Sequence, residues 1–234
     1  MIQVIQLADS LGEAILLGTA FLAAIYIAIV CHEVAHGYVA LLNGDDTAKI
    51  MGRLTANPAK HFNLVGFLML VFVGFGFANP VPINPSKFRN YKKGLIWVSL
   101  AGVLTNLIIA FLLTPFQNIV GGVNVYGMSA FWTGVLEWVY YFLFFSILIN
   151  INLAAFNLLP IAPLDGFNLI SALSKPQNRF IAFLRRYSLM ILLILIMWEY
   201  IPILGNYSPL SIYIGYCNIG LRWLFGKFWG LFGL

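Results

Sequence analysis

The sequence has very few charged residues. Only 9% of its 234 residues are Asp, Glu, Lys or Arg, whereas a soluble domain carries roughly 25%. Hydrophobic residues make up 61%, and the mean hydropathy is +0.90. Several apolar runs exceed the roughly 20 residues that a helix needs to span a bilayer. An ordinary water-soluble domain is therefore excluded, and the composition predicts an α-helical polytopic membrane protein.

Other common features are also scarce. The chain has two cysteines, Cys31 and Cys217, and both lie in apolar segments, so we expect no disulfide framework. The first ten residues hold no basic cluster, so we expect no signal peptide. The net charge is +5, but the basic residues form short clusters between apolar runs. This pattern indicates membrane topology, and we expect no nucleic-acid partner.

The apolar residues gather in segments separated by short polar stretches. None of these stretches could form a soluble domain, which starts at roughly 50 residues. We therefore expect one transmembrane domain over residues 1–234, with no soluble domain. The expected segments are about 11–42, 62–78, 94–115, 130–160, 187–204 and 208–230.

Clusters of Lys and Arg predict which segments cross the membrane, because cytoplasmic loops carry an excess of these residues. Basic clusters in 43–61 and 83–93 flank the run 62–78, so this run should not cross. It contains glycines and leads into the proline-rich stretch ANPVPINP, which forbids a continuous helix. We expect a re-entrant or β-strand element over 62–85 and five crossing helices. Six plain spans are the alternative.

The strongest motif is HEVAH at residues 32–36. On a helix, His32 and His36 are one turn apart, so both imidazoles can bind one metal ion. Glu33 lies roughly 100° around the helix from His32 and can act as a general base without being a ligand. This is the pattern of a zinc metallopeptidase. The alternative is a set of polar residues paired within a helix bundle, which is costly at membrane depth.

A catalytic zinc ion uses three protein ligands and keeps a fourth position open. Asp165, in NLLPIAPLDG at residues 157–166, is the candidate third ligand. Pro160 and Pro163 break the helix at the inner end of the fourth segment and turn Asp165 inward. If 62–78 does not cross, the first and fourth segments run in the same direction and deliver both motifs near the cytoplasmic side.

HEVAH and NLLPIAPLDG together resemble the site-2 protease family (peptidase family M50) of intramembrane zinc metalloproteases, in its compact type without PDZ or CBS domains. The likeness extends through GRLTANPAKHFNLVG, FGFANPVPINPSKFRN and LAGVLTN. It implies one Zn²⁺ per chain, bound by His32, His36 and Asp165, and Glu33 as the group that activates water. The expected activity is hydrolysis of a peptide bond in or near the transmembrane segment of a membrane protein.

The resemblance further implies a multi-pass protein of the bacterial cytoplasmic membrane, with its active site near the cytoplasmic side. Its partners would be the lipid bilayer, a transmembrane protein substrate and a regulatory membrane protein of unknown identity. The alternatives are a catalytically silent scaffold of the same fold and a membrane cation transporter. A transporter predicts polar residues spread through the membrane depth and, often, repeated halves, and we find no repeat in this sequence.

Two asparagines receive roles from the same resemblance. Asn157 would stabilise the oxyanion or orient the substrate carbonyl, and a helix–helix hydrogen bond is the alternative. Asn106 is a further candidate of this type, although polar residues often join transmembrane helices. The role of His61, in NPAKHF, stays open between a metal or substrate contact and a surface or cap position. The sequence departs from the family pattern at Val103, where the family usually has Pro, and at Asn63 and Asn79, where related sequences often carry Asp and Lys.

Substrate binding yields one more expectation. A transmembrane helix hides its peptide bonds in internal hydrogen bonds, so the substrate must be unwound before hydrolysis. The element near 71–85, which includes Phe75 and Phe77, is expected to offer a strand edge that pairs with the unwound substrate.

Overall fold

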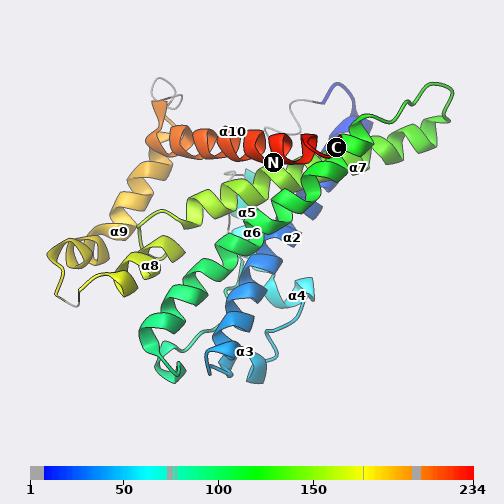
Figure 1. The fold of residues 1–234 in the computed structure, drawn as a ribbon. Coiled ribbons are helices and arrows are strands. Elements are labelled where there is room, and N and C mark those ends of the chain that lie inside the picture. Colours follow the sequence, from blue (N-terminus) through cyan, green and yellow to red (C-terminus); the bar gives the residue numbers. More distant parts are fainter. Residues whose placement is uncertain (1–7, 73–75, 77, 176, 202–206) are drawn as a thin grey trace.

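Four long helices form most of the structure, a computed structural model that describes residues 8–72, 76, 78–175, 177–201 and 207–234 (Figure 1). Each of the four is long and apolar enough to cross a membrane. The expectation of an α-helical polytopic membrane protein is therefore confirmed. The four helices are α2 (Leu11–Leu42), α6 (Tyr91–Gly121), α7 (Ala130–Asn157) and α9 (Arg179–Trp198).

The remaining elements connect and cover these four helices. Helix α10 packs against α7 and α6, and Figure 1 shows α8 and α9 to one side of the bundle. The elements are α3 (Thr47–Ile50), α4 (Pro58–His61), α5 (Leu64–Phe72), the 3-10 helix η1 (Pro85–Lys87), α8 (Asp165–Leu173) and α10 (Pro209–Gly230).

The predicted count of five crossing helices is not confirmed. Helix α10 matches the expected segment 208–230 and has 22 residues. It is not among the four apolar spans, because polar residues such as Asn218 and Arg222 lower its hydropathy.

The predicted β-strand is not found in the described part of 62–85. Leu64–Phe72 is helical, and a short apolar run of this kind cannot be assigned to helix or strand by its periodicity alone. Nine residues of helix span roughly 14 Å, about half of a bilayer core, so α5 is too short to cross. Phe75 and Phe77 lie outside the described residues.

Small residues bring the central helices together. Ala20, Ala24 and Ala28 of α2 are fully buried and pack with Phe145 and Ile149 of α7. Small side chains at such interfaces let helix backbones approach closely. Helix α6 completes the bundle by packing against both α2 and α7, and it also contacts α8. This packing fixes the relative positions of the three helices α2, α6 and α8, which carry the site.

Candidate metal centre

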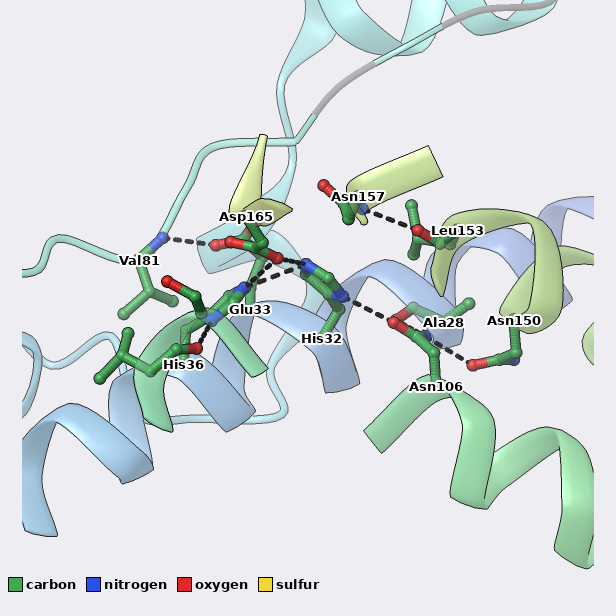
Figure 2. A network of polar contacts seen from close by, with 12 residues as sticks. Ala28, His32, Glu33, His36, Val81, Asn106, Asn150, Leu153, Asn157 and Asp165 are labelled. Carbon is green, nitrogen blue, oxygen red and sulfur yellow. Dashed lines mark hydrogen bonds and ion pairs between the residues drawn. The ribbon is translucent and has the colours of Figure 1, made fainter. Parts of the chain in front are cut away.

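His32, His36 and Asp165 meet in the structure as the sequence predicts. The Nε2 atoms of His32 and His36 lie 3.0 Å apart, and the Oδ2 atom of Asp165 is 3.3 Å from the first and 3.2 Å from the second. Figure 2 shows the three side chains converging on one point. Among the described residues, this is the group of His, Cys, Asp and Glu side chains that could hold a metal ion.

Gly102 of α6 makes room for the two imidazoles. A Cβ atom at this position would lie 2.4 Å from Cε1 of His32 and 2.6 Å from Nε2 of His36. Any larger residue would therefore displace the rings. The stretch LAGVLTN contributes to the site through the absence of a side chain, which the sequence analysis did not foresee.

The outer nitrogens of both imidazoles face hydrogen-bond acceptors. Nδ1 of His36 lies 2.7 Å from the backbone carbonyl of Val98, and Nδ1 of His32 lies 2.6 Å from Oδ1 of Asn106. An acceptor at Nδ1 requires a proton on Nδ1, and in the neutral imidazole this leaves the lone pair on Nε2. Both rings are thereby set to bind a cation through Nε2.

With both imidazoles neutral and protonated on Nδ1, the atoms that face the centre of the site are all hydrogen-bond acceptors. Two Nε2 lone pairs and the carboxylate of Asp165 face one another, and Oδ2 of Asp165 is buried without a hydrogen-bond donor. Both histidines are also buried. A bound cation would satisfy all three acceptors at these distances, and two imidazole nitrogens with one carboxylate oxygen match the ligands of catalytic zinc sites. His32, His36 and Asp165 therefore fit a zinc ion.

Asp165 reaches the site from a short helix of its own. The sequence analysis placed it at the inner end of the fourth segment, but α7 ends at Asn157 and Asp165 is the first residue of α8. A Cβ atom on Gly166 would lie 2.2 Å from the carbonyl oxygen of Leu158, so only glycine permits this tight return of the chain. Ser188 of α9 accepts the N–H of Ala162 at 2.9 Å and holds the turn from outside.

Glu33 lies beside the metal ligands but is held by a different contact. Its Oε2 atom accepts the backbone N–H of Val81 at 2.8 Å. Arg53 fixes the neighbouring backbone, because its guanidinium donates to the carbonyls of Asn79 at 2.8 Å and Pro80 at 3.1 Å. Gly37 lets this stretch approach α2, since a Cβ there would lie 2.9 Å from Cγ1 of Val81.

Two of the departures from the family pattern, Asn63 and Asn79, contact each other. Asn63 donates its side-chain N–H to Oδ1 of Asn79 at 2.8 Å, and Asn79 donates to the carbonyl of Phe62 at 2.7 Å. The backbone N–H of Asn79 also reaches the carbonyl of His61 at 2.9 Å. These amides tie the stretch before Val81 to the start of α5.

The other candidate residues lie in different surroundings. Asn106 is fully buried and contacts His32, so it touches a metal ligand and not the open side of the site. Asn157 donates its amide N–H to the carbonyl of Leu153 within its own helix at 2.9 Å. His61 is buried, so a surface position is excluded, and its Nε2 lies 2.8 Å from the carbonyl of Thr55. It does not belong to the metal-binding group.

Sequence reasoning missed Asn150, Arg53 and Gly102. Asn150 was detectable only as a polar residue in an apolar run. Its contact with Asn106 spans 44 residues, and nothing in the sequence pairs the two. Arg53 was counted only as a topology signal, although the structure places its guanidinium on the backbone beside Glu33.

Comparison with known proteins identifies the family of the chain. The model of the family described as "Peptidase family M50" matches residues 20–196. The chain is 42% identical over 150 residues to "Putative zinc metalloprotease YwhC" of Bacillus subtilis (strain 168), covering 63% of this chain and 66% of that protein. It is 28% identical over 171 residues to "Putative zinc metalloprotease Rip2" of Mycolicibacterium smegmatis (strain ATCC 700084 / mc(2)155), covering 70% of this chain and 61% of that protein.

The chain thus spans slightly less than two thirds of the length of either relative. No solved structure matches it significantly. The family match covers most of the chain and includes both HEVAH and the turn that carries Asp165. The chain belongs to peptidase family M50.

Proposed function

We propose that this chain is an intramembrane zinc metalloprotease that hydrolyses a peptide bond in or near the transmembrane segment of a membrane protein. The observation that carries the proposal is the convergence of three buried acceptor atoms, from His32, His36 and Asp165, next to the carboxylate of Glu33. His32, Glu33 and His36 lie on α2, whose 32 residues are apolar enough to cross a membrane.

In this mechanism His32, His36 and Asp165 hold one Zn²⁺. When bound, the ion supplies Lewis-acid chemistry for peptide hydrolysis. Glu33 takes a proton from the attacking water at its carboxylate and returns it to the leaving amine. The N–H of Val81 occupies Oε2 of Glu33 and thereby fixes the direction of the carboxylate. Asn157, at the end of α7, is the candidate donor to the oxyanion.

We further propose a multi-pass protein of the bacterial cytoplasmic membrane with its site near the cytoplasmic side. His36 is six residues from the end of α2, which corresponds to roughly 9 Å along the helix. Lys49 and Arg53 follow that end, and positive residues favour the cytoplasm. A peptide bond within the outer leaflet would have to move inward to reach this depth.

Substrate pairing at an extended stretch remains part of the proposal, but Asn79–Val81 is a poor place for it. The N–H groups of Asn79 and Val81 are already bonded to His61 and Glu33, and Pro80 has no N–H. This stretch therefore offers no free donor to a substrate strand. We infer that pairing uses other residues of the element near 71–85.

The test is cleavage of a panel of single-span membrane proteins by the purified chain in bilayer discs, with zinc measured in the same samples. We expect one zinc per chain in both the wild type and Glu33→Gln, with cleavage in the wild type alone. Glu137→Gln makes the same change at an exposed position of α7 and should leave cleavage intact. Zinc without cleavage of any substrate favours the silent scaffold, and a folded protein without zinc contradicts the proposal and favours the cation transporter.

A further inference from the structure

A line of buried amides runs from the metal centre into α7. Asn106 of α6 is fully buried and Asn150 of α7 is 1% exposed, although both lie in apolar membrane helices. Buried amides in such surroundings are costly unless every polar atom has a partner. Figure 2 shows Asn150, Asn106 and His32 in sequence, each joined to the next.

The direction of this line is fixed by backbone carbonyls, which can only accept. Asn150 donates its amide N–H to the carbonyl of Ser146 at 2.7 Å, so its Oδ1 atom faces Asn106. Asn106 donates one N–H to that oxygen at 2.6 Å and the other to the carbonyl of Ala28 at 3.2 Å. Its own Oδ1 is left facing Nδ1 of His32 at 2.6 Å.

The opposite orientation of Asn106 is excluded by these partners. A reversed amide would set its Oδ1 against the carbonyl of Ala28 and Oδ1 of Asn150, which are both acceptors. It would also set an N–H against Nδ1 of His32. His32 would then carry its proton on Nε2, the nitrogen that faces His36 and Asp165, and could not bind a cation there.

We propose that Asn150 is a positioning residue of the metal centre. It acts through Asn106 to hold the proton of His32 on Nδ1 and so keeps Nε2 open for zinc. The inference rests on the proposed zinc site. It differs from a simple helix–helix bond between α6 and α7, because it predicts that loss of the Asn150 oxygen weakens metal binding itself.

Helix α7 supplies a matched control. Asn152, two residues along, accepts an N–H from Asn218 of α10 at 2.9 Å. This is also an amide pair between helices, but among the described residues it makes no hydrogen bond to His32, His36 or Asp165. A role in helix packing predicts similar effects for Asn150 and Asn152, whereas the positioning role predicts a loss of zinc affinity for Asn150 alone.

The experiment measures zinc affinity by competition with a chelator, using the full chain in bilayer discs. For Asn150→Leu we expect affinity to fall by roughly 10–100-fold, the usual effect of losing a partner behind a metal ligand. For Asn152→Leu we expect affinity close to the wild type. Asn150→Asp keeps an acceptor facing Asn106 and should retain most of the affinity, although it loses the bond to Ser146.

A second background keeps the inference testable if Asn150→Leu alone does not fold. In Asn106→Asp both side-chain oxygens accept, so the proton of His32 stays on Nδ1 without help from Asn150. One of these oxygens then faces the acceptors of Ala28 and Asn150, so the effect of Asn150→Leu is measured relative to Asn106→Asp itself. Adding Asn150→Leu to Asn106→Asp should therefore cause no further loss of zinc affinity. An equal loss from Asn150→Leu in both backgrounds overturns the inference, as does an equal loss from Asn152→Leu.

The same measurements separate this inference from the proposed function. A wild type that binds zinc while Asn150→Leu binds it equally well contradicts the positioning role alone. A folded wild type that binds no zinc contradicts both proposals.

Discussion

Val81 donates its backbone N–H to the carboxylate of Glu33 at 2.8 Å across a separation of 48 residues. The contact joins HEVAH to the proline-rich stretch that follows α5. Because Pro80 has no N–H and Arg53 binds the carbonyls on either side of the Pro80 nitrogen, this backbone has little freedom to turn away. The general base of the proposed mechanism is therefore oriented by a segment that contains none of the proposed metal ligands.

Replacing Arg53 should disturb the orientation of Glu33 without affecting zinc binding. In Arg53→Gln the two bonds to Asn79 and Pro80 are lost together, so Val81 and Glu33 shift while the metal ligands stay in place. A displacement of about 1 Å at a catalytic group can lower the rate roughly 100-fold. We expect a large fall in kcat with zinc content unchanged, measured by cleavage assay and metal analysis.

Arg179→Lys is the control for this experiment, because Arg179 is exposed at the start of α9 and distant in sequence from Glu33. Arg53→Lys keeps the charge but cannot reproduce the planar pair of N–H donors, so it should fall between the wild type and Arg53→Gln. Normal kcat in Arg53→Gln would show that the Val81 contact does not orient Glu33.

Gly102 should be required for tight zinc binding. In Gly102→Ala the new methyl group would lie 2.4 Å from a ring carbon of His32 and 2.6 Å from Nε2 of His36. The rings would have to move apart, so we expect at least a tenfold loss of zinc affinity, on the scale of other losses around metal ligands. Chelator competition measures it.

Gly134→Ala gives the corresponding change where it should do no harm. A Cβ at this helical position meets nothing within 4 Å, and alanine favours a helix over glycine by about 1 kcal/mol. Zinc affinity should be unchanged and stability equal or slightly higher. If Gly102→Ala bound zinc as tightly as Gly134→Ala, the close approach of α6 to the imidazoles would not matter for the site.

The sequence was sufficient to predict that His32, His36 and Asp165 come together as a group that could hold a metal ion, because their spacing carries the information. His32 and His36 share a helix face whatever surrounds them, and Asp165 follows two helix-breaking prolines. Asn150 and Arg53 could not be found in the same way, since their roles arise from contacts between segments far apart in the chain. The strand expected near 62–85 failed for a related reason, because nine apolar residues fit a helix or a strand equally well.

Removing the metal should destabilise the folded chain. Without a cation, the Nε2 atoms of His32 and His36 and the carboxylate of Asp165 face one another as buried acceptors. Zinc at 100 times its Kd adds about 2.7 kcal/mol to the free energy of unfolding. We expect a chelator to lower the Tm of the wild type, and added zinc to restore it.

Asp165→Asn is the comparison, because an amide is a weak zinc ligand and can donate an N–H to one of the imidazoles. Its Tm should therefore respond little to the chelator. A wild-type Tm that is equally insensitive would mean that no ion is bound at this site in the folded protein.

The last prediction concerns Asp45, which is fully buried in the loop between α2 and α3. Its carboxylate accepts the N–H of Thr47 at 3.0 Å and the N–H of Asn84 at 2.6 Å. Burial alone would raise the pKa of Asp45, but hydrogen bonds from the Thr47 side chain and from these N–H groups outweigh it and lower the pKa below its ordinary value. The ionised carboxylate therefore ties η1 to the end of α2.

A lowered folded-state pKa gives a definite pH dependence. The stabilisation is complete above the unfolded pKa of about 4 and is lost as the pH falls through the lower folded-state pKa. Asp45→Asn turns an N–H toward existing donors and should cost about 1–3 kcal/mol at pH 7, seen as a lower Tm. The gap between variant and wild type should narrow below pH 4, as the wild-type carboxylate is protonated.

Asp46→Asn is the control, because Asp46 is the exposed partner of Lys87 at 2.7 Å and such surface pairs contribute little. Its Tm should stay near the wild type at every pH. A deficit for Asp45→Asn that is the same at pH 3 and pH 7 would show that the loss comes from packing, and that the ionised form of Asp45 is not what holds η1 against α2.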